Sequence, residues 1–144
     1  MADKTGKTWM AVGETDDPEA QIETFTADAA ITKGLPVYLS ADNQVTCAAA
    51  AQNCIGVPVK TVADTKPCPV LVKGRVKVTA GGAIARGVAV YGSDADGKVL
   101  ALADQAVNEG GAATYTVYYN RKLGYALQTA DAKDDLIEIQ VEKA

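Results

Sequence analysis

The chain has 144 residues, enough for one domain of ordinary size, and a formal net charge of −4. This acidic balance argues against a nucleic-acid partner, which would need a basic face. The sequence contains no histidine, so the most common general base and metal ligand of proteins is missing. We therefore expect no enzyme activity, no bound metal and no cofactor.

Three further features concern the compartment. No apolar run approaches the ~20 residues of a membrane span, so no membrane partner is expected. The polar first residues lack the hydrophobic region of a secretion signal. The three cysteines, Cys47, Cys54 and Cys68, are odd in number and lack metal-ligand spacing, which fits a reducing compartment and small buried apolar side chains. We expect a protein that is kept or assembled in the cytoplasm.

Residues 1–24 are predicted to form an N-terminal arm, because they are polar, charged and without periodicity. Trp9, Met10 and Val12 form a short apolar patch inside this segment. A segment that cannot bury its own surface stays disordered alone or becomes ordered on a partner. Either Trp9 folds back onto its own domain, or the patch docks on a neighbouring subunit.

The remainder, residues 25–144, is predicted to be a single β-rich domain built from two repeats. Residues 31–40 match residues 84–93, and residues 55–66 match residues 123–133. The offset grows from about 53 to about 68, so the second copy carries an insertion of about 15 residues. We place the repeat units at about 25–80 and 81–144.

Strands follow in chain order. The first repeat predicts strands at 35–39, 45–47 and 55–59, with turns at Lys33-Gly34 and Asp42-Asn43. Residues 69–79 alternate with period two, which predicts one long half-buried strand with Gly74 as a bulge or a point of close approach. A hairpin turning at Lys73-Gly74 is the alternative.

The second repeat predicts strands near 88–91, 98–102, 114–119, 123–127 and 136–141, and Asp96-Gly97 is a hairpin signal. Residues 103–113, inside the insertion, are predicted to be a polar loop. No segment has a sustained 3.6-residue period. The predicted fold is mainly β, a compact barrel or sandwich of two pseudo-repeated units with little helix and an extended arm.

Candidate sites are few. Residues 93–97 resemble part of a calcium loop but lack its distal Glu, so a turn is favoured. Asp131, Asp134 and Asp135 are interpreted as an exposed acidic turn. Aromatic side chains at 115, 118 and 119 leave a glycan-binding face open as an alternative.

Charge is distributed unevenly along the chain. Residues 14–28 hold six acids and no base, whereas the predicted long strand shows bases on one face. We expect the acidic segment of one subunit to match the basic strand of its neighbour. The candidate capsid or subunit contacts are Trp9, Met10, Glu14, Asp16, Asp17, Lys73, Arg75 and Lys77.

Three motifs resemble those of the capsid decoration proteins of tailed bacteriophages, also called cement proteins. They are the turns Lys33-Gly34-Leu35-Pro36-Val37 and Arg86-Gly87-Val88-Ala89-Val90, the strand Ile55-Gly56-Val57, and the strand Val72-Lys73-Gly74-Arg75-Val76-Lys77-Val78. The resemblance covers residues 25–142.

This resemblance implies a β-rich structural protein without catalytic residues. Such proteins bind the outside of an expanded icosahedral shell, commonly as trimers, and an N-terminal arm often reaches the major capsid protein. The expected partners are therefore the major capsid protein and two further copies of the chain, and the expected location is the capsid exterior of the virion, after assembly in the host cytoplasm. A phage head-fibre base or a glycan-binding surface module is the alternative.

Overall fold

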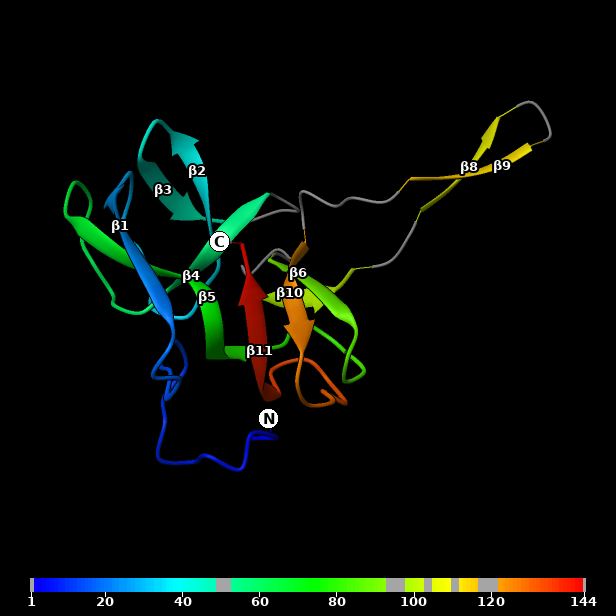
Figure 1. The fold of residues 1–144 in the computed structure, drawn as a ribbon, viewed down its shortest axis with the longest axis horizontal. Coiled ribbons are helices and arrows are strands. Elements are labelled where there is room, and N and C mark those ends of the chain that lie inside the picture. Colours follow the sequence, from blue (N-terminus) through cyan, green and yellow to red (C-terminus); the bar gives the residue numbers. More distant parts are fainter. Residues whose placement is uncertain are drawn as a thin grey trace.

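A computed structural model describes residues 2–48, 53–92, 98–102, 105–109, 112–116 and 122–143. These residues form strands and no helix, which confirms the mainly β prediction (Figure 1). Within this part of the chain, no helix is therefore long and apolar enough to span a membrane. The strands are β1 (Gln21–Ala27), β2 (Val37–Ala41), β3 (Gln44–Cys47), β4 (Cys54–Pro58), β5 (Pro67–Thr79), β6 (Ala89–Gly92), β7 (Val99–Ala101), β8 (Gln105–Glu109), β9 (Ala112–Thr116), β10 (Lys122–Ala126) and β11 (Leu136–Glu142).

Nine strands form one sheet in the order β1-β3-β2-β4-β5-β11-β10-β6-β7. An additional antiparallel pairing of β1 with β5 closes the first five strands into a barrel. Barrel closure removes the exposed sheet edges that would otherwise pair with other chains. We call this barrel the first unit.

The second unit repeats the same order of strands, β5-β11-β10-β6-β7. The parallel pairing of Ala27 with Val45 in the first unit has its counterpart in a parallel bridge between Ala80 and Val99. We call the second unit the second barrel. The long strand β5 belongs to both units. Residues 67–73 of β5 pair with β1, and residues 73–79 pair with β11.

Backbone hydrogen bonds confirm that the two sequence repeats are structural repeats. The N–H of Gly34 donates to the carbonyl of Pro58 at 3.0 Å, and the N–H of Gly87 donates to the carbonyl of Ala126 at 2.7 Å. Both glycines have positive φ, 88° and 81°, as expected for turns that L side chains adopt only with strain. The predicted turns at Lys33-Gly34 and Arg86-Gly87 therefore precede equivalent strands, β2 and β6.

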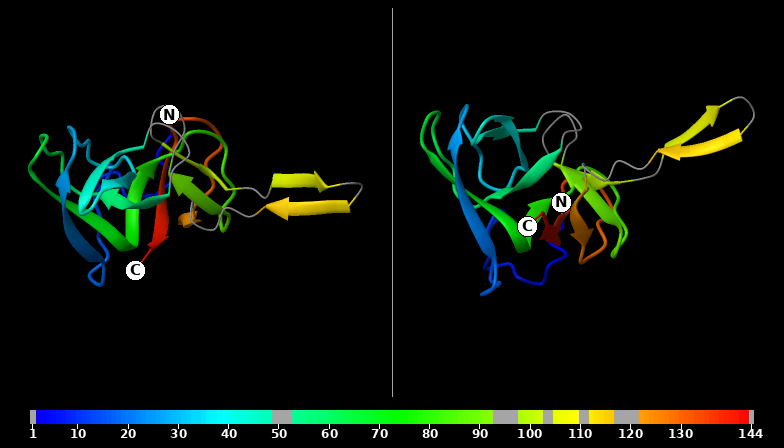
Figure 2. Two further views of the ribbon diagram at one scale, coloured as in Figure 1. Left: turned by 90° about the horizontal axis from the view of Figure 1, so that it is seen from above. Right: turned by 45° about the horizontal axis from the view of Figure 1, so that its top comes forward.

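The insertion in the second copy is a β-hairpin, so the predicted polar loop at residues 103–113 is wrong. Strands β8 and β9 pair with each other in register from Gln105–Thr116 to Glu109–Ala112. They lie away from the nine-stranded sheet in all views (Figures 1 and 2). The strands of this hairpin lack the sustained alternation of apolar and polar residues by which β-strands are recognised in sequence.

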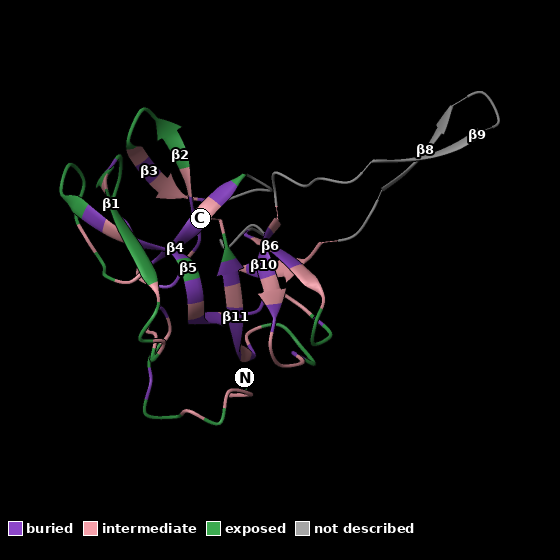
Figure 3. Ribbon diagram, in the orientation of Figure 1, coloured by how far each residue is buried: buried purple, intermediate pink, exposed green. Residues whose placement is uncertain are grey.

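Strand β5 is one continuous strand, as predicted, and the hairpin alternative is excluded. Gly74 is also a point of close approach, because a Cβ there would lie 3.0 Å from the Cα of Ala20 in the arm. The expected half-burial is wrong, however. Most of β5 is buried or half-buried (Figure 3). Leu71 and Lys77, on the face assigned to solvent, are both buried, because barrel strands cover the first and the arm covers the second.

The core consists of two clusters of branched aliphatic side chains. One fills the first unit and includes Ile31, Val37, Val45 and Val70. The larger cluster fills the second unit and also takes in Cys54, Val57 and Leu71 from the first unit. Outward-facing side chains of the first unit therefore complete the core of the second.

Gly56 and Gly124 occupy equivalent positions, and the fold predicts that neither tolerates a side chain. A Cβ at Gly56 would overlap the carbonyl oxygen of Leu71, and one at Gly124 would overlap that of Gln140. Gly56→Ala and Gly124→Ala should each lower the free energy of unfolding by about 1–3 kcal/mol or more, measured by urea denaturation. Gly82→Ala is the matched control. Its Cβ would meet only Leu100 at 3.6 Å, and equal effects at all three positions would contradict the packing argument.

Candidate interaction surfaces

The N-terminal segment, residues 2–20, is docked on the body of its own chain, and we call it the arm. The N–H of Lys4 donates to the carbonyl of Leu136 at 2.8 Å. Further along, the N–H of Gly13 donates to the carbonyl of Lys77 at 2.7 Å, and the N–H of Lys77 donates to the carbonyl of Glu14 at 3.1 Å. The arm therefore extends the sheet beside β5 and β11. The first strand begins at Gln21, so residues 21–24 belong to the first barrel and not to the arm.

Lys77 anchors the arm through its side chain. Its ammonium is buried and donates to the carboxylate of Asp3 at 2.6 Å, to the carbonyl of Met10 at 2.7 Å and to the carbonyl of Lys7 at 3.1 Å. These three acceptors match the three donors of an ammonium group. A buried lysine of this kind is tolerated because every donor has a partner.

The charge of Lys77 also sets the acidity of Asp3. The hydrogen bond from Lys77 is the largest cause that lowers the pKa of Asp3 to about 2, and a hydrogen bond from Thr5 acts in the same direction. Both bonds stabilise the ionised carboxylate. The carboxyl group of Asp3 therefore remains ionised throughout the neutral and mildly acidic range.

Three acids of the acidic segment, Glu14, Asp16 and Asp17, contact basic residues of the same chain. Asp16 lies 2.9 Å from the ammonium of Lys7 and 3.9 Å from the guanidinium of Arg75. The carboxylate of Asp17 accepts the backbone N–H of Arg75 at 3.2 Å. Hydrogen bonding and these nearby charges lower the pKa of both carboxyl groups. Part of the expected charge match is thus made inside one chain, because the arm folds back beside β5. A match between subunits stays a prediction.

The eight candidate contact residues therefore have different environments. Trp9 is 70% exposed and Lys73 is exposed, whereas Met10 and Lys77 are buried in the arm's own contact with the body. Arg75 contacts Asp16 through its guanidinium and Asp17 through its backbone N–H. The remaining member, Glu14, contacts Lys33 at 2.8 Å. Of the eight, Trp9 offers the largest apolar surface to a partner.

The turn at residues 131–135 is not simply an exposed acidic turn. Asp135 is buried, and its carboxylate accepts the backbone N–H groups of Asp131, Ala132 and Ala2. The bond from Asp131 is the largest cause that lowers the pKa of Asp135. This carboxylate closes the turn and holds the start of the arm. The calcium-like run at 93–97 and the aromatic residues at 118 and 119 lie outside the described residues, as does the side chain at 115.

A second uncovered apolar surface lies at one end of the first barrel, and sequence reasoning missed it. Phe25, Leu39, Ile55 and Val72 line a hollow of about 280 Å³, with Glu23 and Lys143 at its border. We call this hollow the mouth of the first barrel. A neighbouring hollow of about 550 Å³ shares Phe25 and Leu39 and continues over Ser40, Ala41, Asp42 and Asn43.

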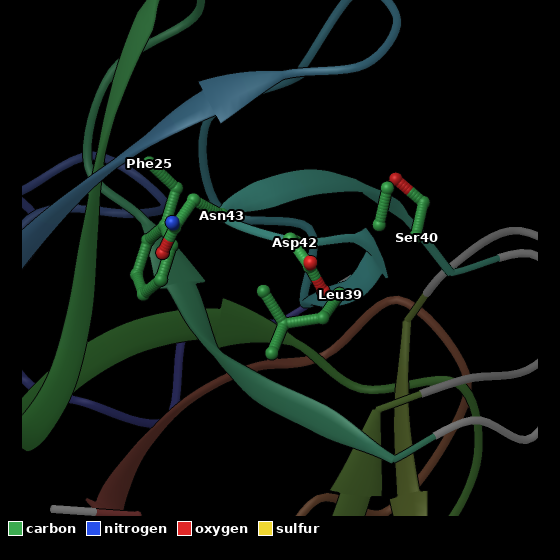
Figure 4. Close-up of a pocket in the computed structure, with 6 residues that line it drawn as sticks. Phe25, Leu39, Ser40, Asp42 and Asn43 are labelled. Atoms are coloured by element: carbon green, nitrogen blue, oxygen red, sulfur yellow. The ribbon is translucent and has the colours of Figure 1, made fainter.

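Figure 4 shows the second hollow: Phe25 from β1 and Leu39 from β2 face it, and Asp42 and Asn43 from the turn after β2 lie beside them. Leu39 is 48% exposed although it has the same strand parity as the buried Val37. The sequence holds one signal for this surface. Leu39 of the first repeat corresponds to Gly92 of the second. The side chain at this end of the barrel therefore differs between the two units.

Comparisons with known proteins give a family match and similar solved structures. The model of a family described as phage cement protein matches residues 24–142. The head fiber gp8.5 N base of bacteriophage phi29 is similar in fold, with a TM-score of 0.55 and 16% sequence identity. The similarity covers 87% of this chain and 96% of that chain. No curated protein matches the sequence.

Proposed function

This chain belongs to the phage cement protein family, and we propose that it stabilises a phage capsid by binding the outer surface of the assembled shell. We further propose that its contacts are with the major capsid protein and that three copies associate. The observation that carries the proposal is the extent of the family match, residues 24–142, which spans both barrels.

The physical basis of cementing is preferential binding. A protein that binds the assembled shell and not the free capsid subunits stabilises assembly by mass action. Many symmetry-related copies then multiply a contact that is weak for each one. This role requires a binding surface and no catalytic groups, so we propose a structural and not a catalytic protein.

The two uncovered apolar surfaces support this proposal. Trp9 and the mouth of the first barrel expose aromatic and aliphatic side chains that a solitary small protein would normally bury or replace. Aromatic side chains near the centre of an interface carry much of its binding energy. These surfaces are therefore candidates for contacts in the decorated shell.

A head-fibre base is the second candidate function, because the similar phi29 structure is a head fiber base. Its 16% identity supports a shared fold and no shared role by itself. The two functions differ in what the bound protein carries. A fibre base would hold a further fibrous chain, whereas a cement protein would be complete on the shell.

The proposal is tested by mixing purified protein with expanded capsids that lack it and imaging the particles by cryo-electron microscopy. We expect regular density on the outer surface at symmetry-related positions, and a higher melting temperature of the decorated shell. The same capsids without the protein are the control. Particles that stay bare at saturating protein, with unchanged melting, would reject the proposed function.

A further inference from the structure

The mouth of the first barrel is uncovered, but the equivalent end of the second barrel is closed. The repeat offsets place Phe25, Leu39 and Ile55 at the positions of the second-unit residues Val78, Gly92 and Leu123. The strand pairings of β4 with β5 and of β10 with β11 place Val72 at the position of Val141. The three aliphatic members of that second set are 0% exposed, and Gly92 is buried too. At the rim, the exposed Glu23 corresponds to the buried Val76.

The first unit supplies the cover for the second. The thiol of Cys54 donates to the carbonyl of Gly92 at 3.0 Å. A Cβ at Gly92 would lie 2.7 Å from that sulfur and within contact of Pro36 as well. Another unit of the same fold therefore closes the end of the second barrel. The 48% exposure of Leu39 shows that the described residues leave the first barrel without such a cover.

Trp9, in the arm, is an exposed apolar side chain whose backbone is held in place. The neighbouring Met10 is buried, and its carbonyl accepts the ammonium of Lys77. The N–H of Met10 donates to the carbonyl of Lys7 at 3.0 Å, which fixes the turn. Because the backbone on both sides of Trp9 is anchored, little conformational entropy is lost when the indole is buried.

The mouth matches an indole in size and in chemistry. A cavity of about 150 Å³ holds benzene, so 280 Å³ admits the larger ring. Glu23 lies at the border, where its carboxylate is of the type that accepts an indole N–H. An apolar lining that includes the aromatic ring of Phe25, with an acceptor at its edge, favours tryptophan over a purely aliphatic occupant.

Trp9 cannot fill the mouth of its own chain. The arm crosses one side of the molecule, whereas the end of β1 and strand β2, which carry Phe25 and Leu39, lie on the other (Figure 1). The anchored backbone around Trp9 prevents it from crossing. The occupant must come from another molecule.

We propose that Trp9 of one copy inserts into the mouth of the first barrel of a second copy. The contact is head-to-tail, because the inserting side chain and the receiving surface are different parts of the chain, and such contacts form closed rings when the rotation closes. One indole buries only about 150–250 Å², far below a stable interface of about 800 Å² per partner. The contact is therefore weak between free molecules and is reinforced when neighbours are held on one shell.

The inference rests on the proposed self-association and not on capsid binding, so it is tested on the free protein. Trp9 is the single tryptophan of the chain, and its fluorescence reports on this side chain alone. As protein concentration rises, we expect the emission to shift to shorter wavelength and the weight-average mass in sedimentation to increase together. Trp9→Ala should weaken association by about 30-fold or more.

The receiving surface is tested by Leu39→Glu, with Ile22→Glu as its matched control. Both residues are exposed to a similar degree, 48% and 46%, but Ile22 does not line the mouth. Leu39→Glu should abolish the fluorescence shift, and Ile22→Glu should leave it unchanged. A mixture of Trp9→Ala with Leu39→Glu should form one-to-one dimers that grow no further, although neither variant associates alone.

Loss of association in Leu39→Glu without restoration in the mixture would overturn the proposal, as would unchanged association in both variants. If both variants associate normally but no longer bind capsids, the mouth receives the capsid protein and the proposed occupant is wrong. Capsids that remain bare with the wild-type protein would reject the proposed function while leaving the fluorescence result in force.

Discussion

Lys77→Met is expected to lower the free energy of unfolding by about 2–4 kcal/mol. Methionine keeps the volume of the buried stem but removes three hydrogen bonds to the carboxylate of Asp3 and to the carbonyls of Lys7 and Met10. These acceptors would then lose the one charged donor that they share at the centre of the contact between arm and body. Urea denaturation followed by circular dichroism gives the difference directly.

Lys73→Met is the matched control, because Lys73 lies on the same strand and is exposed. A surface substitution of this kind should change stability by no more than about 0.5 kcal/mol. Asp3→Asn combined with Lys77→Met completes a double-mutant cycle, and the coupling energy between the two sites should be favourable. Equal stability of Lys77→Met and wild type would show that the buried ammonium contributes nothing to the docking of the arm.

Removal of residues 1–24 should cost on the order of 5 kcal/mol or more, which approaches the whole stability of a typical domain. An arm that is separate from the domain, as residues 1–24 were interpreted from the sequence, would leave melting nearly unchanged when it is removed. The contacts now predict the opposite, because the truncation removes the buried side chain of Met10, the acceptors of Lys77 and the first half of β1. That half of β1 closes the first barrel against β5.

Calorimetry of the truncated and full-length chains measures this loss. Trp9→Ala is the control within the arm. Its side chain is 70% exposed, so the free energy of unfolding of the variant should lie within about 0.5 kcal/mol of the wild-type value. A truncated chain that melts cooperatively at the wild-type temperature would restore the original expectation of a dispensable arm.

The fold was predictable from sequence where local chemistry determines it. The turns at Lys33-Gly34 and Arg86-Gly87 require a residue that tolerates positive φ, and glycine marks both positions. The period-two pattern of β5 likewise follows from strand geometry alone. The hairpin β8–β9 was missed because its sequence is polar and rich in glycine, and its backbone pairing leaves no apolar pattern.

The interaction surfaces were less predictable, because they depend on which elements cover one another. Lys77 has the strand parity of a solvated lysine, and only the docked arm buries it. Leu39 has the parity of a core residue, and only the absence of a cover exposes it. Alternation along a strand shows which side chains share a face, but it does not show whether anything is packed against that face.

Because both barrels share β5, no boundary divides the molecule into two independent units. A cut at residue 80, the boundary between the repeats, would leave all of β5 in the first half and none in the second. The first half would keep its barrel but would expose the edge of residues 73–79 that pairs with β11. The second half would lack the strand that begins its own sheet, so neither repeat is a self-sufficient folding unit.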